Sequence, residues 1–220
     1  MCLTKLCYDV SMKKYLVVNK DAYNNLADQY KSRLNEYKFK DKELLDTFMQ
    51  LAKTKTDCAE VLELGPGSGL ALQIFEEEGM KTYAIDIAEK IIAVAKDSSP
   101  NTTFINDDFL QHDFGTKKFD AICAKAFLHL FPKDDAYTVL NKIADLTQEN
   151  GALFLATTIH DAPTEGYEEK QDYSESPIRY RKKWTEAELL EAFTHNWRIV
   201  EKNYNTERSK RWLALTLQKK

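Results

Sequence analysis

A glycine-rich junction between two apolar segments constrains this chain more than any other feature. In VLELGPGSGLALQIFEEEG, residues 61–79, an apolar run breaks into three glycines, a proline and a serine, and then resumes with helical periodicity. Glycine at positions 65, 67 and 69 lets the backbone approach a ligand that a side chain would displace. The first N–H groups of a helix also lack partners within the helix. The stretch therefore predicts a strand, a ligand-contacting loop and a helix.

Downstream of residue 57, predicted strands and helices alternate, which is typical of a parallel sheet covered by helices. Thr185 and Glu188 have the spacing of a helix capping box. Two final strand-like runs are separated by a polar turn, which indicates an antiparallel hairpin. The sequence thus predicts an α/β fold with a Rossmann-like, doubly wound, seven-stranded sheet, mostly parallel, with one reversed strand at its edge. The predicted strands are 59–64, 81–86, 102–107, 118–126, 151–158, 197–205 and 209–218, and the predicted helices are 69–79, 88–100, 132–151 and 184–193.

The first 57 residues are predicted to be helical. Apolar and aromatic side chains recur at three- and four-residue steps in two segments, and Asn19 or Asp21 is available to cap the first of them. The two predicted helices are 19–40 and 41–53. We therefore expect an N-terminal helical cap segment, 1–57, followed by a main domain, 58–220.

Composition and charge exclude several classes of protein. The chain has 220 residues, of which 43% are hydrophobic and 30% charged, as expected of a globular chain. Its net charge of −4 argues against binding nucleic acid mainly by neutralising phosphates. It has no apolar run with the length of a signal-peptide core or a membrane span, so we expect a cytoplasmic protein that does not enter the membrane. The four cysteines lack C-x-x-C spacing, so neither a zinc site nor a disulfide framework is predicted.

The spacing of the glycines discriminates between two kinds of ligand. Dinucleotide-binding loops have the pattern G-x-G-x-x-G or G-x-G-x-x-A, whereas here Gly69 comes one residue early and Leu70 stands where a small residue is needed. Glu63 lies in the strand just before the loop, where its carboxylate would repel a bound pyrophosphate. The same carboxylate suits a ligand that carries an ammonium and a sulfonium group.

The segment Glu63-x-Gly65-x-Gly67-x-Gly69 resembles motif I of the class I S-adenosylmethionine-dependent methyltransferases. The order and spacing of the later motifs extend the resemblance over roughly residues 58–217, including the reversed strand of the terminal hairpin. The resemblance implies that the chain is a methyltransferase that binds S-adenosylmethionine and releases S-adenosylhomocysteine.

The resemblance also assigns residues to the cofactor. Asp86 ends the second strand, where this family holds the two ribose hydroxyls with an acid. Asp107 and Asp108 follow the third strand, where an acid meets the adenine amino group and an apolar neighbour meets its ring. The fourth strand borders the methyl group. The implied cofactor residues are Glu63, Gly65, Gly67, Gly69, Asp86, Ile87, Asp107, Asp108, Phe109 and Lys125, with Tyr23 and Tyr30 closing over the cofactor. A helix N-cap is the less favoured interpretation of Asp86, and the two roles can coexist; helix packing explains Tyr23 and Tyr30 nearly as well as closure over the cofactor.

The methyl acceptor is less constrained by the sequence. Residues 124–127 read Ala-Lys-Ala-Phe, without the Asn/Asp-Pro-Pro-Tyr/Phe of enzymes that methylate amide or adenine nitrogens. They resemble instead the branch that acts on small metabolites. The acid pairs of the metal-dependent catechol enzymes are missing, so no metal is predicted. His129 and His160 follow strand ends and could accept a proton, which makes them the candidate catalytic residues; local packing is the alternative interpretation of each.

Residues 159–183 have no regular period and are long for a connection, so we expect a substrate lid loop there. Arg179 and Arg181 would share one side of an extended chain, with Tyr180 on the other. Arginines aimed at an acceptor would recognise a carboxylate or phosphate, so an acidic or phosphorylated acceptor is one hypothesis. The predicted substrate-binding residues are Arg179, Tyr180, Arg181 and Trp184.

The leading interpretation is a methyltransferase that acts on an O or N atom of a small molecule. A protein methyltransferase, a catalytically silent methyltransferase-like binding module and, less favoured, an RNA methyltransferase and a nicotinamide dehydrogenase are the alternatives. No obligate protein partner is evident from the sequence, and a monomer is the default expectation.

Overall fold

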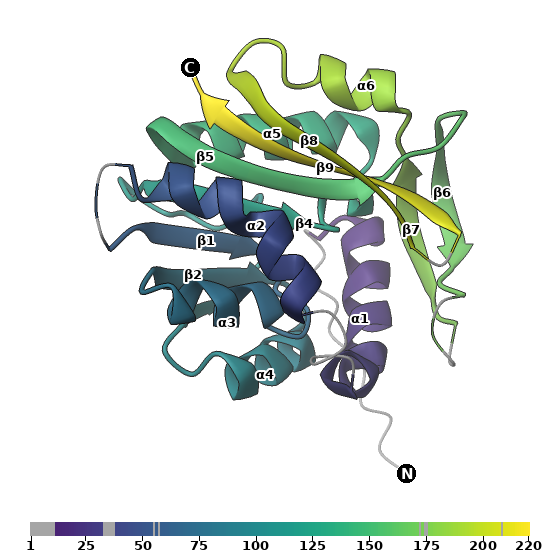
Figure 1. Cartoon of the computed structure of the whole chain (residues 1–220). Helices are drawn as coiled ribbons and strands as arrows, with labels where there is room; N and C mark the ends of the chain where they lie inside the picture. Colours follow the sequence, from purple (N-terminus) through teal and green to yellow (C-terminus); the bar gives the residue numbers. More distant parts are fainter. Residues whose placement is uncertain are drawn as a thin grey trace.

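The computed structural model describes residues 12–32, 38–54, 56, 58–171, 173, 176–207 and 209–220. Its centre is a seven-stranded sheet with the strand order β3-β2-β1-β4-β5-β9-β8, which confirms the predicted Rossmann-like α/β fold (Figure 1). A separate two-stranded sheet pairs β6 with β7. The strands are β1 (Glu60–Leu64), β2 (Lys81–Asp86), β3 (Thr103–Asn106), β4 (Phe119–Lys125), β5 (Thr147–Thr158), β6 (Thr164–Glu169), β7 (Ile178–Lys183), β8 (Trp197–Glu207) and β9 (Lys210–Lys219).

The order of the strands places the candidate site. The five strands β3, β2, β1, β4 and β5 run parallel, and the order reverses between β1 and β4. Open α/β sheets bind ligands beyond the carboxyl ends of the strands at such a reversal. The reversed strand β9 pairs antiparallel with both β5 and β8, so it lies inside the sheet. The prediction that the reversed strand forms the edge was therefore wrong, because β8 occupies that position.

Helices cover both faces of the sheet, as the alternating sequence pattern predicted. α2, α3 and α4 lie on one face, and α5 and α6 lie on the other (Figure 1). Phe48, Phe75 and Phe154 fill the first layer, where the ring centroid of Phe48 is 5.6 Å from that of Phe75. The helices are α1 (Lys14–Ser32), α2 (Lys38–Ala52), α3 (Leu70–Glu77), α4 (Glu89–Ser98), α5 (Lys133–Leu146) and α6 (Glu186–Glu191), with a short 3₁₀ helix, η2 (Leu128–Leu130).

The first helix begins earlier than predicted. α1 starts at Lys14, so Asn19 lies inside the helix and does not cap it. The Asn19 side chain is buried and links two other elements: its amide donates to the Leu130 carbonyl at 3.0 Å, and its oxygen accepts the Tyr180 N–H at 2.8 Å. Asn19, which was expected to cap the helix, therefore makes tertiary hydrogen bonds instead. The part of the predicted helix 19–40 between residues 33 and 37 lies outside the described residues.

The two N-terminal helices contact different parts of the molecule. α1 lies along α4 and β7, whereas α2 packs on α3, β5 and β9 (Figure 1). The α2 side chains Leu45 and Phe48 are at most 1% exposed. α2 therefore belongs to the helical layer of the sheet, and only α1 stands over the carboxyl ends of the strands. The division at residue 57 stays a prediction.

Several element boundaries differ from the predictions. α5 ends at Leu146, and the chain is extended from Thr147 onward, so Gly151 lies within β5 and does not stop the helix. A Cβ atom at Gly151 would lie 2.8 Å from the Asp120 carbonyl oxygen, which explains the glycine by close packing. The expected ends at Gly79 and Thr185 are confirmed. Gly79 has φ +77° just after α3, and Thr185 and Glu188 form a capping box at α6.

The segment predicted to be irregular is ordered into a hairpin. Residues 164–169 and 178–183 form the antiparallel strands β6 and β7, which stand beside α1 (Figure 1). Opposite charges face each other across the pair, as in Glu168 with Arg179 and Glu165 with Lys182. Such pairs stabilise a sheet. The prediction of an irregular lid was therefore wrong about its structure, while a covering role remains a prediction.

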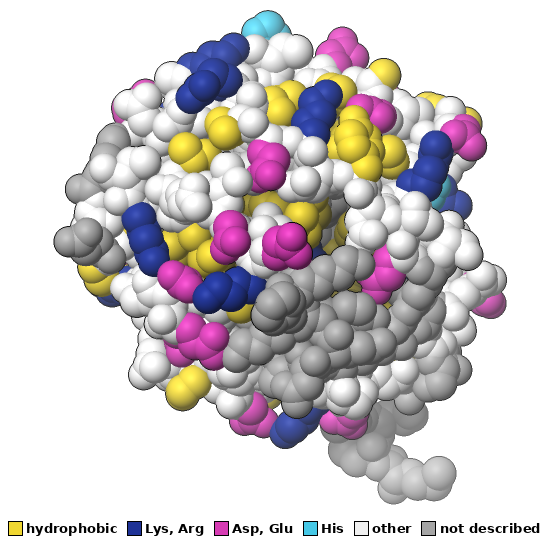
Figure 2. Space-filling view, in the orientation of Figure 1, with side chains coloured by type: hydrophobic (Ala, Val, Ile, Leu, Met, Phe, Trp, Pro, Cys, Tyr) yellow, Lys and Arg dark blue, Asp and Glu magenta, His cyan; other side chains and the backbone are white. Residues whose placement is uncertain are grey.

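Acidic and basic side chains are interspersed over the face that Figure 2 shows, without a broad area of either sign. None of the helices in the described part of the chain is long and apolar enough to cross a membrane. Cys58 is exposed and Cys123 is buried, and neither forms a disulfide bond among the described residues. Cys2 and Cys7 lie outside the described residues.

Candidate cofactor and acceptor site

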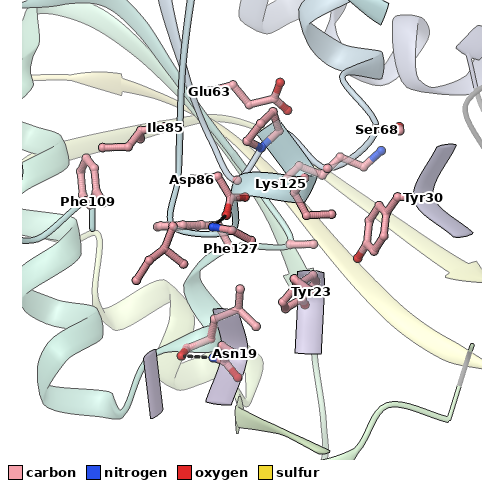
Figure 3. A pocket seen from close by; sticks show the side chains of 18 of the residues that line it. Asn19, Tyr23, Tyr30, Glu63, Ser68, Ile85, Asp86, Phe109, Lys125 and Phe127 are labelled. Carbon is pink, nitrogen blue, oxygen red and sulfur yellow. Dashed lines mark hydrogen bonds between the residues drawn. The ribbon is translucent and has the colours of Figure 1, made fainter. Parts of the chain in front are cut away.

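A cavity of about 220 Å³ opens beyond the carboxyl ends of β1, β2 and β4, under α1. Figure 3 shows Asp86 near its centre, Phe109 and Tyr30 on opposite sides, and Tyr23 and Asn19 reaching in from α1. It is lined by Leu16, Asn19, Tyr23, Tyr30, Glu63, Gly65, Pro66, Gly67, Ser68, Leu70, Ala71, Ile85, Asp86, Ile87, Ala88, Ile91, Asp107, Asp108, Phe109, Lys125, Ala126, Phe127, Leu130 and Phe131. All the residues that the sequence assigned to a cofactor lie on this wall, except Gly69.

The three glycines of the loop have different surroundings. Each has a positive φ, between +56° and +82°, which disfavours a residue with a side chain. A Cβ atom at Gly65 would lie 3.0 Å from the Phe127 ring, and one at Gly67 would lie 3.4 Å from the Tyr30 ring. A Cβ atom at Gly69 would lie 3.0 Å from the backbone oxygen of Ala95 in α4. Gly69 therefore serves the packing of the loop on α4, while Gly65 and Gly67 keep the cavity wall open.

Four carboxylates line this cavity together with one basic side chain, Lys125. Glu63 projects from β1 and is 3% exposed. Asp86 ends β2, and its Oδ1 accepts the Ala88 N–H at 2.7 Å. Burial raises the pKa of Asp86 to about 7, against a usual value of 3.8, although the Ala88 and Ile87 N–H groups counteract it. This concentration of acid favours a ligand that carries positive charge and hydroxyl donors.

Asp107 and Asp108 differ in their surroundings. Asp107 is paired with the His112 Nδ1 at 2.9 Å, and that hydrogen bond lowers its pKa. Asp108 is 8% exposed, and its pKa is raised by burial. Phe109 follows directly and packs edge-on against Phe127, with the ring centroids 6.0 Å apart. Asp108 and Phe109 thus provide a buried acid beside an aromatic ring.

Sequence reasoning missed several residues of the cavity wall. The ring of Phe127 packs between those of Phe109 and Phe131, edge-on to the first and tilted to the second, and these rings form an apolar side of the cavity. Ala126 has φ +57°, an uncommon conformation for a residue with a side chain, and its N–H donates to the Ala156 carbonyl at 2.8 Å. Such backbone strain gathers at functional sites. Phe127 carried a sequence signal, since it ends the apolar run of β4; the Ala126 conformation carried none.

The two tyrosines of α1 close one side of the cavity. Their ring centroids lie 6.0 Å apart, and the Tyr30 ring stacks on Tyr173 with centroids 5.3 Å apart. Burial and the neighbouring tyrosines raise the pKa of Tyr30 well above its usual value, so it stays neutral. Lys31 and Asp97 form an ion pair of 2.7 Å that joins the end of α1 to α4. These contacts place α1 across the glycine loop.

The two candidate catalytic histidines lie outside the cavity lining, near the end of β5. His129 is 4% exposed, with its Nδ1 3.5 Å from the Thr157 hydroxyl. His160 has its Nε2 3.2 Å from the Thr158 hydroxyl. Burial, followed by Arg179 and Arg181, holds the pKa of His129 well below its usual 6.5. The pKa of His160 is lowered by burial and then by Arg181 and Lys183. Both imidazoles are neutral at physiological pH.

The four candidate substrate residues separate into two groups. Trp184 is fully buried in the main core, and Tyr180 packs against Tyr15 and Tyr167, so neither lines the cavity. Arg179 donates from Nη1 to the hydroxyl of the cavity residue Tyr23 at 3.1 Å. Arg181 donates to Glu168 at 3.1 Å and to Thr158. The structure therefore brings Arg179 to the cavity wall through Tyr23, whereas Tyr180 contacts the wall through its backbone N–H, which donates to Asn19. Arg181 and Trp184 have no such contact among the described residues.

In the part of the chain that the structure describes, no group of three His, Cys, Asp or Glu side chains is arranged to hold a metal ion.

Comparison with known sequences relates the glycine loop and its flanking strands to one family. Residues 61–151 match the profile of a family described as a methyltransferase domain. A curated relative from Anoxybacillus flavithermus, described as an uncharacterized methyltransferase, is 23% identical over 140 residues, which are 63% of this chain and 66% of the relative. The alignment thus spans just under two thirds of either protein.

Comparison with solved structures covers nearly the whole chain. The 1,6-didemethyltoxoflavin-N1-methyltransferase of Burkholderia thailandensis, solved with 1,6-didemethyltoxoflavin and S-adenosylhomocysteine, is 19% identical with a TM-score of 0.70, covering 96% of this chain and 93% of that one. The magnesium protoporphyrin IX methyltransferase of Synechocystis, solved with S-adenosylmethionine, is 16% identical with a TM-score of 0.68, covering 96% and 99%. At such identities the likeness is one of fold.

Proposed function

We propose that this chain, whose residues 61–151 form a methyltransferase domain within the class I methyltransferase fold, transfers a methyl group from S-adenosylmethionine to an O or N atom of a small molecule. One observation carries the proposal. The cavity at the reversal of strand order is lined by an open glycine loop, four carboxylates and a single lysine. A sulfonium and an ammonium group suit that charge, whereas a dinucleotide pyrophosphate would be repelled by it.

The residues present fit the cofactor at three places. Gly65 and Gly67 present no side chain to the cavity, so an amino-acid moiety can lie against their backbone near Glu63. The Asp86 carboxylate suits two ribose hydroxyls. Asp108 and Phe109 suit the adenine amino group and ring, and we assign that role to Asp108 because it is the more buried of the two acids. These roles, with Ile87, Asp107 and Lys125 as neighbours, belong to the proposal.

Methyl transfer requires the protein mainly to orient the acceptor atom and the methyl group. When bound, the cofactor supplies a methyl carbon that is displaced from a sulfonium, leaving a neutral thioether. The chain must hold the acceptor atom in line at about 3 Å and exclude water, and such positioning can contribute ~7–11 kcal/mol. In the proposed roles, Tyr23 and Tyr30 exclude water on the side of α1. The acceptor's proton passes to a neutral base, for which His129 and His160 are the two candidates.

The candidate base can be identified from rate measurements. Replacing the catalytic histidine with alanine is expected to lower kcat by about 100-fold, the lower end for general base catalysis. His195→Ala, an exposed site, serves as the matched control. Because the pKa of His129 lies well below 6.5, kcat at saturating cofactor should not decline between pH 8 and about 6.5, the usual value for histidine. Unchanged turnover in both His129→Ala and His160→Ala would remove the role of base from these residues.

The function itself is tested with methyl-labelled S-adenosylmethionine and a panel of metabolites that carry hydroxyl and amine groups. The proposal predicts label transfer to at least one small molecule. Label transferred only to protein would favour the protein methyltransferase. Binding of the cofactor without transfer to either class would favour the silent binding module.

A further inference from the structure

We propose that the methyl acceptor carries an anionic group, a carboxylate or a phosphate, which is held by Arg179 and Arg181 on the hairpin β6–β7. This inference rests on the proposed methyltransferase function and adds the chemical class of its acceptor. Its foundation is a cluster that we name the arginine cluster: Arg179, Arg181 and Lys183 of β7 and Glu168 of β6.

The strand geometry places the two arginines on one side of the hairpin. Residues two apart on a strand share a face. In the structure Arg179 and Arg181 both reach Glu168, at 3.9 Å and 3.1 Å, while Tyr180 packs against Tyr15 and Tyr167. The arginines are 3% and 8% exposed; the guanidinium of Arg179 faces Tyr23 of α1, and that of Arg181 faces Thr158 at the end of β5.

The charges within the cluster do not balance. Lys183 also binds Glu168, at 3.0 Å, so three cations converge on one carboxylate. The four groups together therefore carry an excess of two positive charges. The guanidinium of Arg179 donates to the Tyr23 hydroxyl, and that of Arg181 donates to the Thr158 hydroxyl. Arg181 shares the Glu168 carboxylate with Lys183, so a bound anion would add a second counter-charge beside it.

The Arg181 guanidinium has an N–H group that could donate a hydrogen bond to a ligand. Its Nε is buried and has no hydrogen-bond partner among the described residues. A guanidinium with a free N–H edge is suited to two parallel hydrogen bonds with a carboxylate or phosphate. A second basic group stands nearby: the Nζ of Lys170, which is 6% exposed, lies 4.5 Å from the Tyr173 ring centroid and 6.0 Å from that of Tyr23.

The position of the cluster relates it to methyl transfer. Tyr23, which Arg179 contacts, lines the cavity assigned to the cofactor. His129 lies within the electrostatic reach of Arg179, Arg181 and Lys170, all of which lower its pKa. An anion at the arginines would thus lie on the side of Tyr23 away from the cofactor, close to a candidate base. The cluster would orient the acceptor, and its nucleophilic atom would point toward the cavity.

The test uses benzoate, benzamide and inorganic phosphate as probes, titrated by calorimetry into the protein with and without saturating S-adenosylhomocysteine. We expect benzoate or phosphate to bind at least about 10-fold more tightly than benzamide, the effect of one charge-assisted hydrogen bond. The stronger of the two anions identifies a carboxylate or a phosphate site. Equal binding of benzoate and benzamide, or no anion binding in the millimolar range, would overturn the inference.

Two substitutions with opposite effects separate recognition from simple structural loss. Arg179→Gln should weaken anion binding by about 10-fold or more, whereas Glu168→Gln removes the competing carboxylate and should tighten binding severalfold. Arg198→Gln, on the exposed edge strand β8, is the matched control for loss of an arginine and should have no effect. If Glu168→Gln weakens anion binding as Arg179→Gln does, the cluster has only a structural role.

Failure of this inference is distinguishable from failure of the proposed function. Binding of S-adenosylhomocysteine is measured in the same experiment. Cofactor binding without any preference for anions would leave the methyltransferase proposal intact and reject the anionic acceptor. Anion binding without cofactor binding would support the anion site and reject the methyltransferase proposal.

Discussion

Replacing Asp86 with asparagine is expected to weaken the binding of S-adenosylmethionine and S-adenosylhomocysteine by about 100-fold, because hydrogen bonds to a charged acceptor contribute roughly 1.5–3 kcal/mol each. An amide oxygen can still accept the Ala88 N–H, which the carboxylate accepts at 2.7 Å, so the local turn should survive. What the substitution removes is the charge that two ribose hydroxyls would share.

The same substitution is expected to stabilise the protein without ligand. The pKa of Asp86 is about 7 in the folded protein, above its usual 3.8, so the folded state favours the protonated form. Ionised Asp86 therefore opposes folding: its cost is absent below about pH 4, grows as the pH rises, and is complete above about pH 7. Because the side chain remains partly open to the cavity, we expect a gain of ~1–2 kcal/mol at pH 8, less than the ~4 kcal/mol that corresponds to the whole displacement.

Urea unfolding and calorimetry at pH 4 and pH 8 measure both effects. Asp113→Asn is the matched control, since its Oδ1 accepts the Gly115 N–H at 2.7 Å in a turn like that of Asp86 but at an exposed position. The control should change neither cofactor affinity nor its pH dependence. Wild-type affinity should rise between pH 6 and 8 as Asp86 ionises. Full cofactor affinity in Asp86→Asn would contradict the role assigned to this carboxylate.

The second large effect is expected at Gly69. Gly69→Ala should lower the free energy of unfolding by about 2–4 kcal/mol, from a left-handed backbone that disfavours alanine and from a steric clash. The new Cβ would lie 3.0 Å from the Ala95 oxygen and 3.1 Å from its Cα, and these backbone atoms cannot move away as a side chain can. The glycine loop would have to separate from α4.

Gly79→Ala separates the two contributions. Gly79 has a similar φ, +77° against +82°, but a Cβ atom there would meet nothing within 4 Å. It should therefore show only the backbone cost of about 1 kcal/mol. Urea denaturation of both variants measures the difference. Equal destabilisation would show that the contact between the loop and α4 is not what requires glycine at position 69.

The residues that line the proposed cofactor cavity could be grouped from sequence because they follow local rules. Asp86 is the last residue of β2, Asp108 lies two residues after the end of β3, and the loop glycines have the positive φ values that their residue type allows. Parallel strands bring such residues to one edge of a sheet. Knowing the strand ends was therefore enough to group them, although not to choose between Asp107 and Asp108.

Features that depend on long-range contacts could not be read. Asn19 has the composition of a cap, but its hydrogen bonds to Leu130 and Tyr180 span more than 100 residues of sequence. The strands β6 and β7, TEGYEE and IRYRKK, consist mainly of charged residues, so they lack the apolar alternation that indicates a strand. Their pairing is supported by opposite charges across the ladder, which become visible only when the two strands are aligned.

The most direct test of the central claim is calorimetric titration of the wild-type chain with S-adenosylhomocysteine and, separately, with NAD. The proposed function predicts one S-adenosylhomocysteine bound per chain with micromolar affinity, and no heat from NAD under the same conditions. Binding of NAD, or the absence of S-adenosylhomocysteine binding, would contradict the assignment of the acidic cavity to a sulfonium cofactor.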